Sequence, residues 1–132
     1  YGEAIEHFMR AARISPNIPD AYNGLGISYR KLGDNNSALS YYLKTLTLDS
    51  TSVYAYINLG NLYDDLGNTG EAILWYKKAL VLQPNSPQLH YNLGITYYHQ
   101  GDMPKALEIL RQSARLGDAD AQAFLRERGE RW

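Results

Sequence analysis

The stretch AYINLGNLY, residues 55–63, recurs with substitutions at two other places in the chain. Residues 21–29 read AYNGLGISY, and residues 89–97 read LHYNLGITY. The Leu-Gly pairs of the three copies begin at residues 25, 59 and 93, so the interval between copies is 34 residues each time. A fixed period of about 20–50 residues is typical of stacked supersecondary units. The period therefore predicts a chain built from consecutive copies of one small structural unit.

The second half of each unit repeats with the same interval. Two further series have members 34 residues apart, namely Ala38, Ala72 and Ala106, and Tyr42, Tyr76 and Leu110. Ala4 and Phe8 continue these two series toward the N-terminus, with no first half of a unit before them. The chain thus contains three full units that follow half of another.

This pattern resembles that of the tetratricopeptide repeat family, whose unit is a pair of antiparallel helices. The family shows an aromatic residue, Leu-Gly and Tyr in the first helix, then Ala, an aromatic, a small residue and Pro in the second. The middle unit matches throughout, at Tyr56, Leu59, Gly60, Tyr63, Ala72, Tyr76, Ala79 and Pro84. The half-unit matches at Ala4, Phe8, Ala11 and Pro16. Departures occur at Thr45, Ser50, His90 and Ala119, and milder ones at Leu110 and Ser113.

The resemblance implies an all-α fold, an α-solenoid of antiparallel helix pairs in a right-handed superhelix. We expect a single domain with five consecutive parts. These are the second helix of a half-repeat (1–18), repeats at 19–52, 53–86 and 87–118, and a C-terminal capping helix with a tail (119–132). Ala121, Phe124 and Leu125 lie on one side of the last helix, as the closing element of a solenoid requires.

Composition narrows the possible functions. The chain has 132 residues, 45% of them hydrophobic, which suffices for one continuous core. Its net charge of −1 gives no electrostatic reason to expect nucleic acid or an anionic membrane as a partner. No apolar run approaches the roughly 20 residues that span a bilayer, so we expect no membrane insertion. A chain that begins at Tyr1 inside a half-repeat is expected to be part of something longer or to have been trimmed. The compartment stays open, with a soluble, cytoplasmic location favoured.

Glycine recurs within the first helix of each unit, at Gly26, Gly60 and Gly94. Glycine inside a helix costs about 1 kcal/mol relative to alanine, so a compensating contact is expected. We interpret the glycines as places where two helices approach closely. The alanines expected on the opposite side are Ala38, Ala72 and Ala106, and the rings expected to fill the gaps beside them are Tyr29, Tyr63 and Tyr97.

No arrangement of residues typical of catalysis is present. His7, His90 and His99 lack the spacing of metal ligands, and the absence of cysteine removes thiolate chemistry. Asp64 and Asp65 are neighbours on a helix, so their side chains point about 100° apart and cannot easily hold one ion. We therefore expect no enzymatic activity, no metal and no cofactor.

The resemblance implies that the first helices of successive repeats line a concave groove that binds a peptide or a helix. The side chains expected in this groove are Asn23, Ile27, Arg30, Tyr54, Ile57, Asn58, Asn61, Asp65, Tyr91, Asn92, Ile95, Tyr98 and His99. Asn58 and Asn92 occupy equivalent places, and an amide can both donate to and accept from a peptide backbone. The alternative is that both asparagines are only solvated polar residues.

Members of the family that bind chaperone tails hold a C-terminal carboxylate with basic and amide residues. The matching positions here are Asn23, Ile27, Asn58, Gln88 and Asn92, of which only Asn58 agrees and none is Lys or Arg. That function is disfavoured. An amide-rich, aromatic and mildly acidic groove suits a neutral or weakly basic peptide with one or two apolar side chains. As a further hypothesis, His99 makes this binding dependent on pH.

Our first interpretation is a non-catalytic scaffold or adaptor that binds a segment of another protein. A second is self-assembly, in which Ile5 and Phe8 of the unpaired first helix bury themselves against another copy in a homo-oligomer. A third makes the chain the repeat segment of a larger enzyme or regulator. The sequence does not name the partner.

Overall fold

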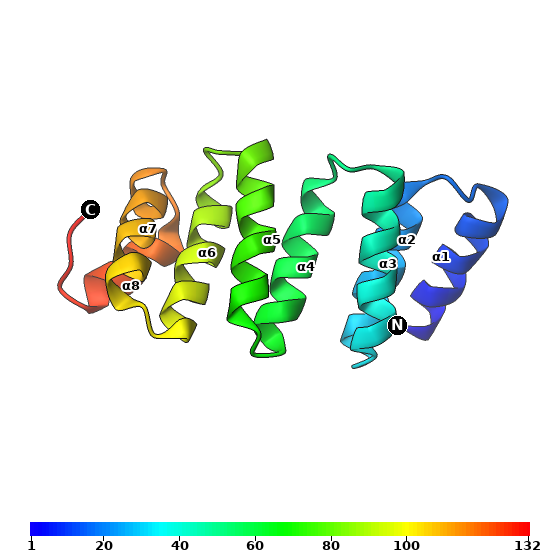
Figure 1. Ribbon diagram of the computed structural model, residues 1–132, viewed down its shortest axis with the longest axis horizontal. Helices are drawn as coiled ribbons and strands as arrows, with labels where there is room; N and C mark the ends of the chain where they lie inside the picture. The colour runs from blue at the N-terminus through cyan, green and yellow to red at the C-terminus, as the bar shows by residue number, and fades with distance from the viewer. The chain divides into compact units, whose positions relative to one another are not determined.

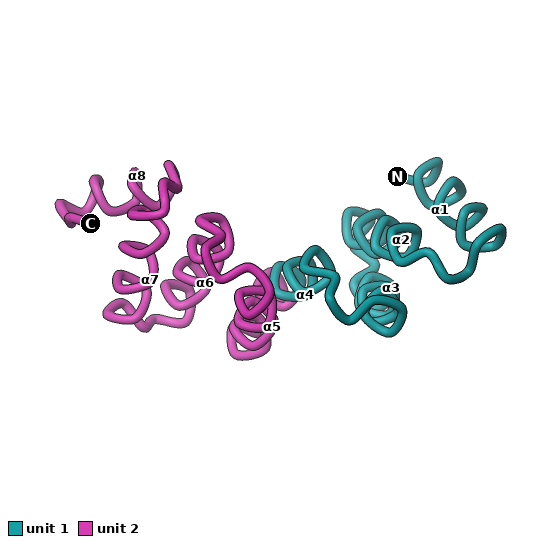
Figure 2. Tube along the Cα trace, turned by 90° about the horizontal axis from the view of Figure 1, so that it is seen from above, with its two compact units in different colours: residues 1–62 teal, residues 63–132 magenta.

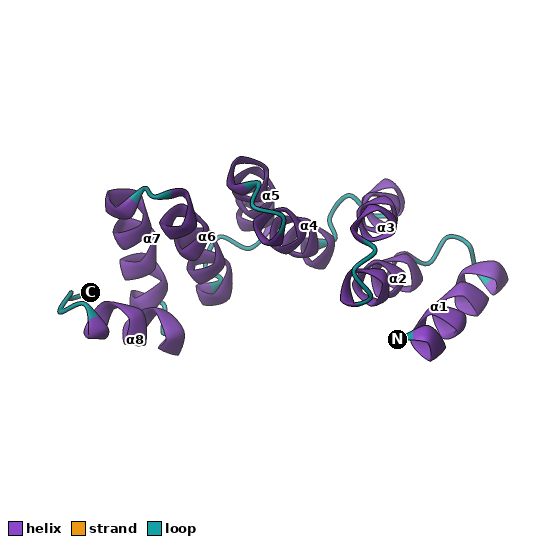
Figure 3. Cartoon of the chain, turned by 90° about the horizontal axis from the view of Figure 1, so that it is seen from below, coloured by secondary structure: helices purple, strands orange, loops and turns teal.

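The computed structural model describes residues 1–132 as eight α-helices without strands (Figures 1 and 3). The helices are α1 (Gly2–Ile14), α2 (Pro19–Lys31), α3 (Asn35–Leu48), α4 (Val53–Asp65), α5 (Thr69–Leu82), α6 (Pro87–Gln100), α7 (Met103–Arg115) and α8 (Ala119–Glu127). The expected all-α class is confirmed. The chain divides into two compact units, unit 1 (Tyr1–Leu62) and unit 2 (Tyr63–Trp132), which Figure 2 colours separately.

The turns that precede α3, α5 and α7 share one design. A glycine with positive φ, Gly33, Gly67 or Gly101, is followed by a residue that caps the next helix. The carboxylate of Asp34 accepts from the backbone N–H of Ser37 at 3.1 Å, and Asn68 and Asp102 make the equivalent bonds. Positive φ suits glycine because it has no Cβ, and the polar cap satisfies an N–H that lacks a helical partner. The glycine and the cap together therefore allow a short turn between two consecutive helices.

The aromatic residue near the start of a unit's first helix fixes the loop before it. The hydroxyl of Tyr22 donates to the Pro16 carbonyl at 2.9 Å, and that of Tyr56 donates to the Ser50 carbonyl at 2.8 Å. His90 occupies the equivalent position in the next unit, and its Nδ1 lies 2.8 Å from the Ser86 carbonyl within its own helix start. The shorter histidine ring thus bonds nearer to its own backbone than the tyrosines do.

Two of the recurring glycines, Gly26 and Gly94, accommodate a large side chain rather than an alanine. A Cβ at Gly26 would lie 2.5 Å from a ring atom of Tyr42, and a Cβ at Gly94 would lie 2.7 Å from Cγ of Leu110. A Cβ does not approach a non-bonded carbon so closely in real structures, so the glycines leave room for these buried side chains. The expectation that alanines lie opposite the glycines is corrected, because the side chains nearest to Gly26 and Gly94 are Tyr42 and Leu110.

In unit 1, α2 and α3 form a pair and α1 packs against α2. The Phe8 ring lies where a side chain on Gly24 would be, so this second glycine allows α1 to approach α2. The hydroxyl of Tyr41 on α3 lies 3.9 Å from the sulfur of Met9. The half-repeat helix is therefore seated on the pair that follows it.

In unit 2, α6 pairs with α7, and α8 packs against α7. The buried cluster that joins α7 to α8 consists of Leu110, Ala114, Ala121 and Leu125. The last residues are tied back to α7, because Arg111 forms a 2.6 Å ion pair with Glu130 and donates to the Arg131 carbonyl. None of the eight helices is both long enough and apolar enough to cross a membrane.

Candidate functional site

The expected groove residues of unit 1 come from α2 and α4 and differ in exposure. Tyr54 is 74% exposed, which leaves its ring available for contact with another molecule. The other side chains in this unit's part of the expected groove are half-buried, namely Asn23, Ile27, Arg30, Ile57, Asn58 and Asn61. This part of the surface therefore combines amides, aliphatic side chains and one exposed tyrosine.

Asn23 and Asn58 are bonded to each other across two helices. The Asn58 side-chain amide donates to the Asn23 amide carbonyl at 2.9 Å. An asparagine amide offers two donors and a carbonyl with two lone pairs. The bond between them therefore uses only part of the hydrogen-bonding capacity of each amide. The bond fixes the orientation of both side chains and leaves donor and acceptor groups for another molecule.

The other positions of the same register have different surroundings. Gly24 stands where Asn58 stands one unit later, and it is covered by the Phe8 ring. Asn92, one unit further on, accepts from the Gln88 amide of its own helix at 2.9 Å. The two asparagines expected to act alike therefore differ in their hydrogen bonds. Asn58 bonds to a residue of another helix, whereas Asn92 bonds to a residue of its own helix.

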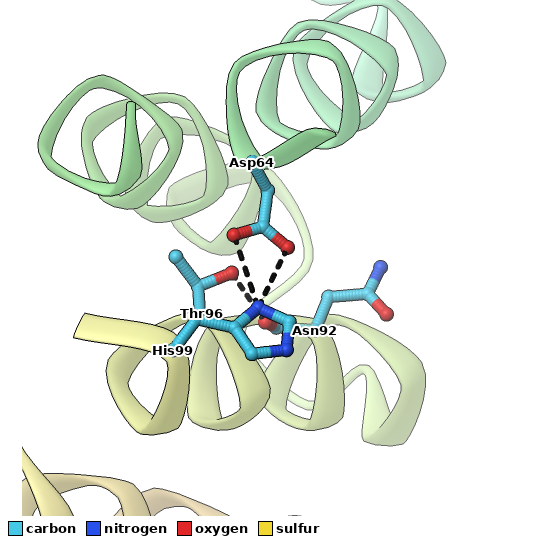
Figure 4. Close-up of polar contacts among 4 residues, drawn as sticks. All are labelled: Asp64, Asn92, Thr96 and His99. Carbon is cyan, nitrogen blue, oxygen red and sulfur yellow. Dashed lines mark hydrogen bonds and ion pairs between the residues drawn. The ribbon is translucent and has the colours of Figure 1, made fainter. Parts of the chain in front are cut away.

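In unit 2, His99 is bonded to Asp64 (Figure 4). The imidazole Nδ1 lies 3.2 Å from Oδ2 and 3.3 Å from Oδ1 of the carboxylate. The His99 side chain is 49% exposed and that of Asp64 is 17% exposed. Figure 4 also shows Asn92 and Thr96 on the same helix as His99, where the Thr96 hydroxyl donates to the Asn92 carbonyl at 2.9 Å. Asp65 is exposed.

Tyr98 contacts the cationic side chain of Arg128, the residue that follows α8 as its C-cap. The guanidinium carbon of Arg128 lies 3.8 Å from the centre of the Phe124 ring and 5.1 Å from that of Tyr98. Arg128 also donates to the Tyr98 hydroxyl at 3.1 Å, while the two rings meet edge to face with centres 5.4 Å apart. Tyr98 remains 37% exposed. Sequence reasoning missed Arg128 because it lies beyond the repeats, although the i, i+4 spacing of Phe124 and Arg128 was a signal.

Tyr91 and Ile95 lie against the buried cluster that joins α7 to α8. Both are half-buried and pack on the cluster that contains Leu110 and Leu125. Desolvation raises the pKa of the Tyr91 hydroxyl, and the nearby carboxylates of Asp120 and Asp118 act in the same direction. The structure thus separates these two side chains from the more exposed Tyr98 and His99.

Ile5 and Phe8, expected at a self-association surface, are both half-buried. The Phe8 ring is engaged with α2 at Gly24, as described above. Elsewhere in residues 1–132, no three His, Asp or Glu side chains gather in a way that would bind a metal ion.

Four sequence models of one repeat family match the chain. One described as "TPR repeat" matches residues 60–101, and three described as "Tetratricopeptide repeat" match residues 19–52, 41–73 and 89–122. Together the matches extend from residue 19 to residue 122. The chain belongs to the tetratricopeptide repeat family.

Solved structures similar to this tetratricopeptide repeat protein include chains named MamA. "Crystal structure of MamA protein" matches with a TM-score of 0.80 and 21% identity, over 92% of this chain and 66% of that chain. "Crystal structure of MamA" gives 0.78 and 26% over 92% and 69%, and "MamA MSR-1 C2" gives 0.72 and 24% over 90% and 67%. This chain therefore spans about two thirds of the length of the MamA chains. A search of curated protein sequences finds no match.

The similarity in structure supports the tetratricopeptide repeat solenoid as the fold. Membership of the repeat family identifies the chain as a protein-interaction scaffold module.

Proposed function

We propose that this tetratricopeptide repeat protein is a non-catalytic adaptor that binds a peptide segment of another protein through the expected groove side chains named above, those of α2 and α4 in unit 1 and, separately, those of α6 in unit 2. The observation that carries the proposal is the bond between Asn58 and Asn23. Two amides held at 2.9 Å are ordered before a ligand arrives, so less conformational entropy is lost on binding. Their remaining donors and acceptors match the alternating N–H and C=O groups of an extended backbone.

The neighbouring side chains define the ligand further. Ile27 and Ile57 are half-buried and Tyr54 is exposed, so this part of the surface favours an apolar side chain on the ligand. In unit 2, the Asp64 carboxylate lies 3.2 Å from Nδ1 of His99, and the neighbouring Asp65 side chain is exposed. A neutral or weakly basic peptide with one or two apolar side chains suits this combination.

The experiment is selection of peptides from a random displayed library on the parent protein, followed by affinity measurement with variants. Asn58→Ala removes the cross-helix pair, and Asn92→Ala removes the amide on α6. Asn36→Ala is the matched control because Asn36 is an exposed asparagine on α3, outside the proposed surface. We expect Asn58→Ala to weaken binding by about tenfold, the effect of losing roughly 1.4 kcal/mol, and Asn36→Ala to leave it unchanged.

Thermal melts of the three variants test whether each is folded. The affinity of Asn58→Ala is compared only if this variant is folded. Selected peptides that bind the parent and Asn58→Ala equally would refute the amide pair as a binding element. Peptides that lose affinity equally with Asn36→Ala would place the site elsewhere.

Self-association through α1 is a second candidate, and one observation favours it. Ala38 and Tyr42 of α3 are fully buried, whereas Ala4 and Phe8, the equivalent residues of α1, are only half-buried. A second copy would remove more of this apolar surface from water. Light scattering over a wide range of protein concentration tests this candidate. A monomer at every concentration would rule it out.

A further inference from the structure

The outer side of α5 carries two exposed aliphatic residues. Leu74 is 55% exposed and Val81 is 81% exposed. They are seven residues apart, so they project from nearly the same side of the helix. That side is opposite to the one formed by Ala72 and Ala79, which are fully buried. More than half of each of these two side chains is therefore in contact with solvent, and together they form an apolar stripe on the helix.

The repeated architecture shows that the fold does not need these residues. One unit earlier, α3 carries Ser40 and Thr47 at the same two positions. One unit later, α7 carries Glu108 and Arg115. Both helices bury their inner alanines as completely as α5 does, with Ala38 and Ala106 at 0% exposure. An apolar stripe found on one of three equivalent helices is the kind of exposed patch that marks an interaction site.

Two lysines border the stripe. At about 100° per residue, Lys77 and Lys78 fall on opposite sides of the line through Leu74 and Val81, each within roughly 60° of it. The ammonium of Lys78 lies 4.4 Å from the centre of the Trp75 ring, which holds this charge beside the stripe. The surface thus has an apolar centre between Lys77 and Lys78, and Glu71, three residues before Leu74, lies on the Lys78 side at the N-terminal end of the stripe.

We propose that Leu74, Val81, Lys77 and Lys78 form a second interaction surface that binds an acidic amphipathic helix of a partner protein. A helix with apolar residues two turns apart matches the two-turn spacing of Leu74 and Val81. Acidic residues on both sides of its apolar face meet Lys77 and Lys78, which gives charge complementarity. A second copy of α5 does not meet this requirement, because its own lysines would oppose these. The surface is distinct from the one proposed on α2, α4 and α6.

The test uses the complete chain and a synthetic helical peptide with leucines on one face and glutamates on both sides of it. The main variant is Leu74→Ser with Val81→Thr, which copies the residues of α3 and so keeps a sequence that the repeat tolerates. We expect NMR shift changes on α5 in the parent and an affinity at least about tenfold lower in the double variant. Lys77→Gln with Lys78→Gln should weaken binding mainly at low salt.

Leu43→Lys is the matched control. Leu43 is an exposed leucine of α3, 41% exposed, and it stands at the position of Lys77. This variant should bind the peptide as the parent does, and a glutamine version of the peptide should bind more weakly to both.

Four results would overturn the proposal. The first is no shift on α5 at about 1 mM peptide, a concentration that detects even weak binding. The second is equal affinity in the parent and the Leu74→Ser, Val81→Thr variant. The third is binding of the parent to anionic lipid vesicles in preference to the peptide. The fourth is a concentration-dependent dimer of the parent that the double variant abolishes, because a second copy would then cover the stripe.

Discussion

Nδ1 of His99 lies 3.2 Å from Oδ2 of Asp64, a contact between the end of α4 and the last turn of α6. The two carboxylates at the end of α4 therefore have different environments, since Asp64 faces a histidine and Asp65 is exposed. This agrees with the expectation that neighbouring helix residues point in different directions. The pair carries opposite charges only while the imidazole is protonated.

The first prediction concerns the strength of this contact. A double-mutant cycle of Asp64→Asn and His99→Gln, measured by chemical denaturation at mildly acid pH, should give a coupling free energy of about 0.2–1 kcal/mol. The value is small because half of the histidine side chain is in contact with water. At alkaline pH the coupling should shrink, since a neutral imidazole has no charge to attract the carboxylate. A coupling that is equally large at both pH values would show that the contact is not an ion pair.

The second prediction uses the space beside Gly26. Gly26→Ala should lower the free energy of unfolding by about 1–3 kcal/mol, because its Cβ would overlap the buried Tyr42 ring. The matched control is Gly70→Ala in α5, where no atom lies within 4 Å of the added Cβ. That variant should be neutral or slightly more stable, since alanine is the better helix former by up to about 1 kcal/mol. Thermal and urea melts of both variants measure the difference, and equal stabilities would contradict the packing described.

The third prediction concerns the cap of α3. Hydrogen bonds from the side chain and backbone of Ser37 lower the pKa of the Asp34 carboxyl below its ordinary value of 3.8. A depressed carboxyl pKa stabilises the fold above the unfolded-state value and loses this contribution as the pH falls through the folded-state value. The loss should therefore occur below about pH 3.8, where an NMR titration of Asp34 should show its midpoint.

Asn68 shows that an amide can cap the equivalent helix, α5. Asp34→Asn should therefore keep the cap while it removes this part of the acid dependence. If Asp34→Asn loses stability with acid as steeply as the parent does, the titration belongs to other groups.

Much of the fold follows from the sequence because one interval, 34 residues, repeats through the chain. Local signals agree with it, as the Gly-Asp pairs at 33–34 and 101–102 both end one helix and cap the next. The repeat does not predict the contacts of residues that depart from its pattern. His90 is buried, and its bond to the Ser86 carbonyl depends on the short reach of its ring.

The candidate surface can be predicted less completely from the sequence. Its details depend on contacts between residues that do not occupy equivalent positions of the repeat. Asn58 bonds to Asn23, which is 35 residues away rather than 34, so the repeat alone does not pair them. Arg128 reaches Tyr98 from the C-cap of α8, which lies outside the repeats. From the sequence, Gly24 would leave space in the groove. In the structure, the Phe8 ring of the preceding helix fills this space. Side-chain length and helix packing decide such contacts.

The fourth prediction tests α8 as the element that covers the end of unit 2. Leu125 is completely buried against α7, so Leu125→Ala should cost about 2–5 kcal/mol through lost burial and an incompletely filled cavity. Leu116→Ala is the control, since Leu116 is 36% exposed in the turn before α8 and should cost clearly less. Hydrogen exchange should show faster exchange across α8 in Leu125→Ala, with the inner turns of α6 and α7 less affected, because terminal elements open at lower free energy than the core. Uniformly faster exchange across α6, α7 and α8 would instead mean that the three helices unfold as one cooperative unit.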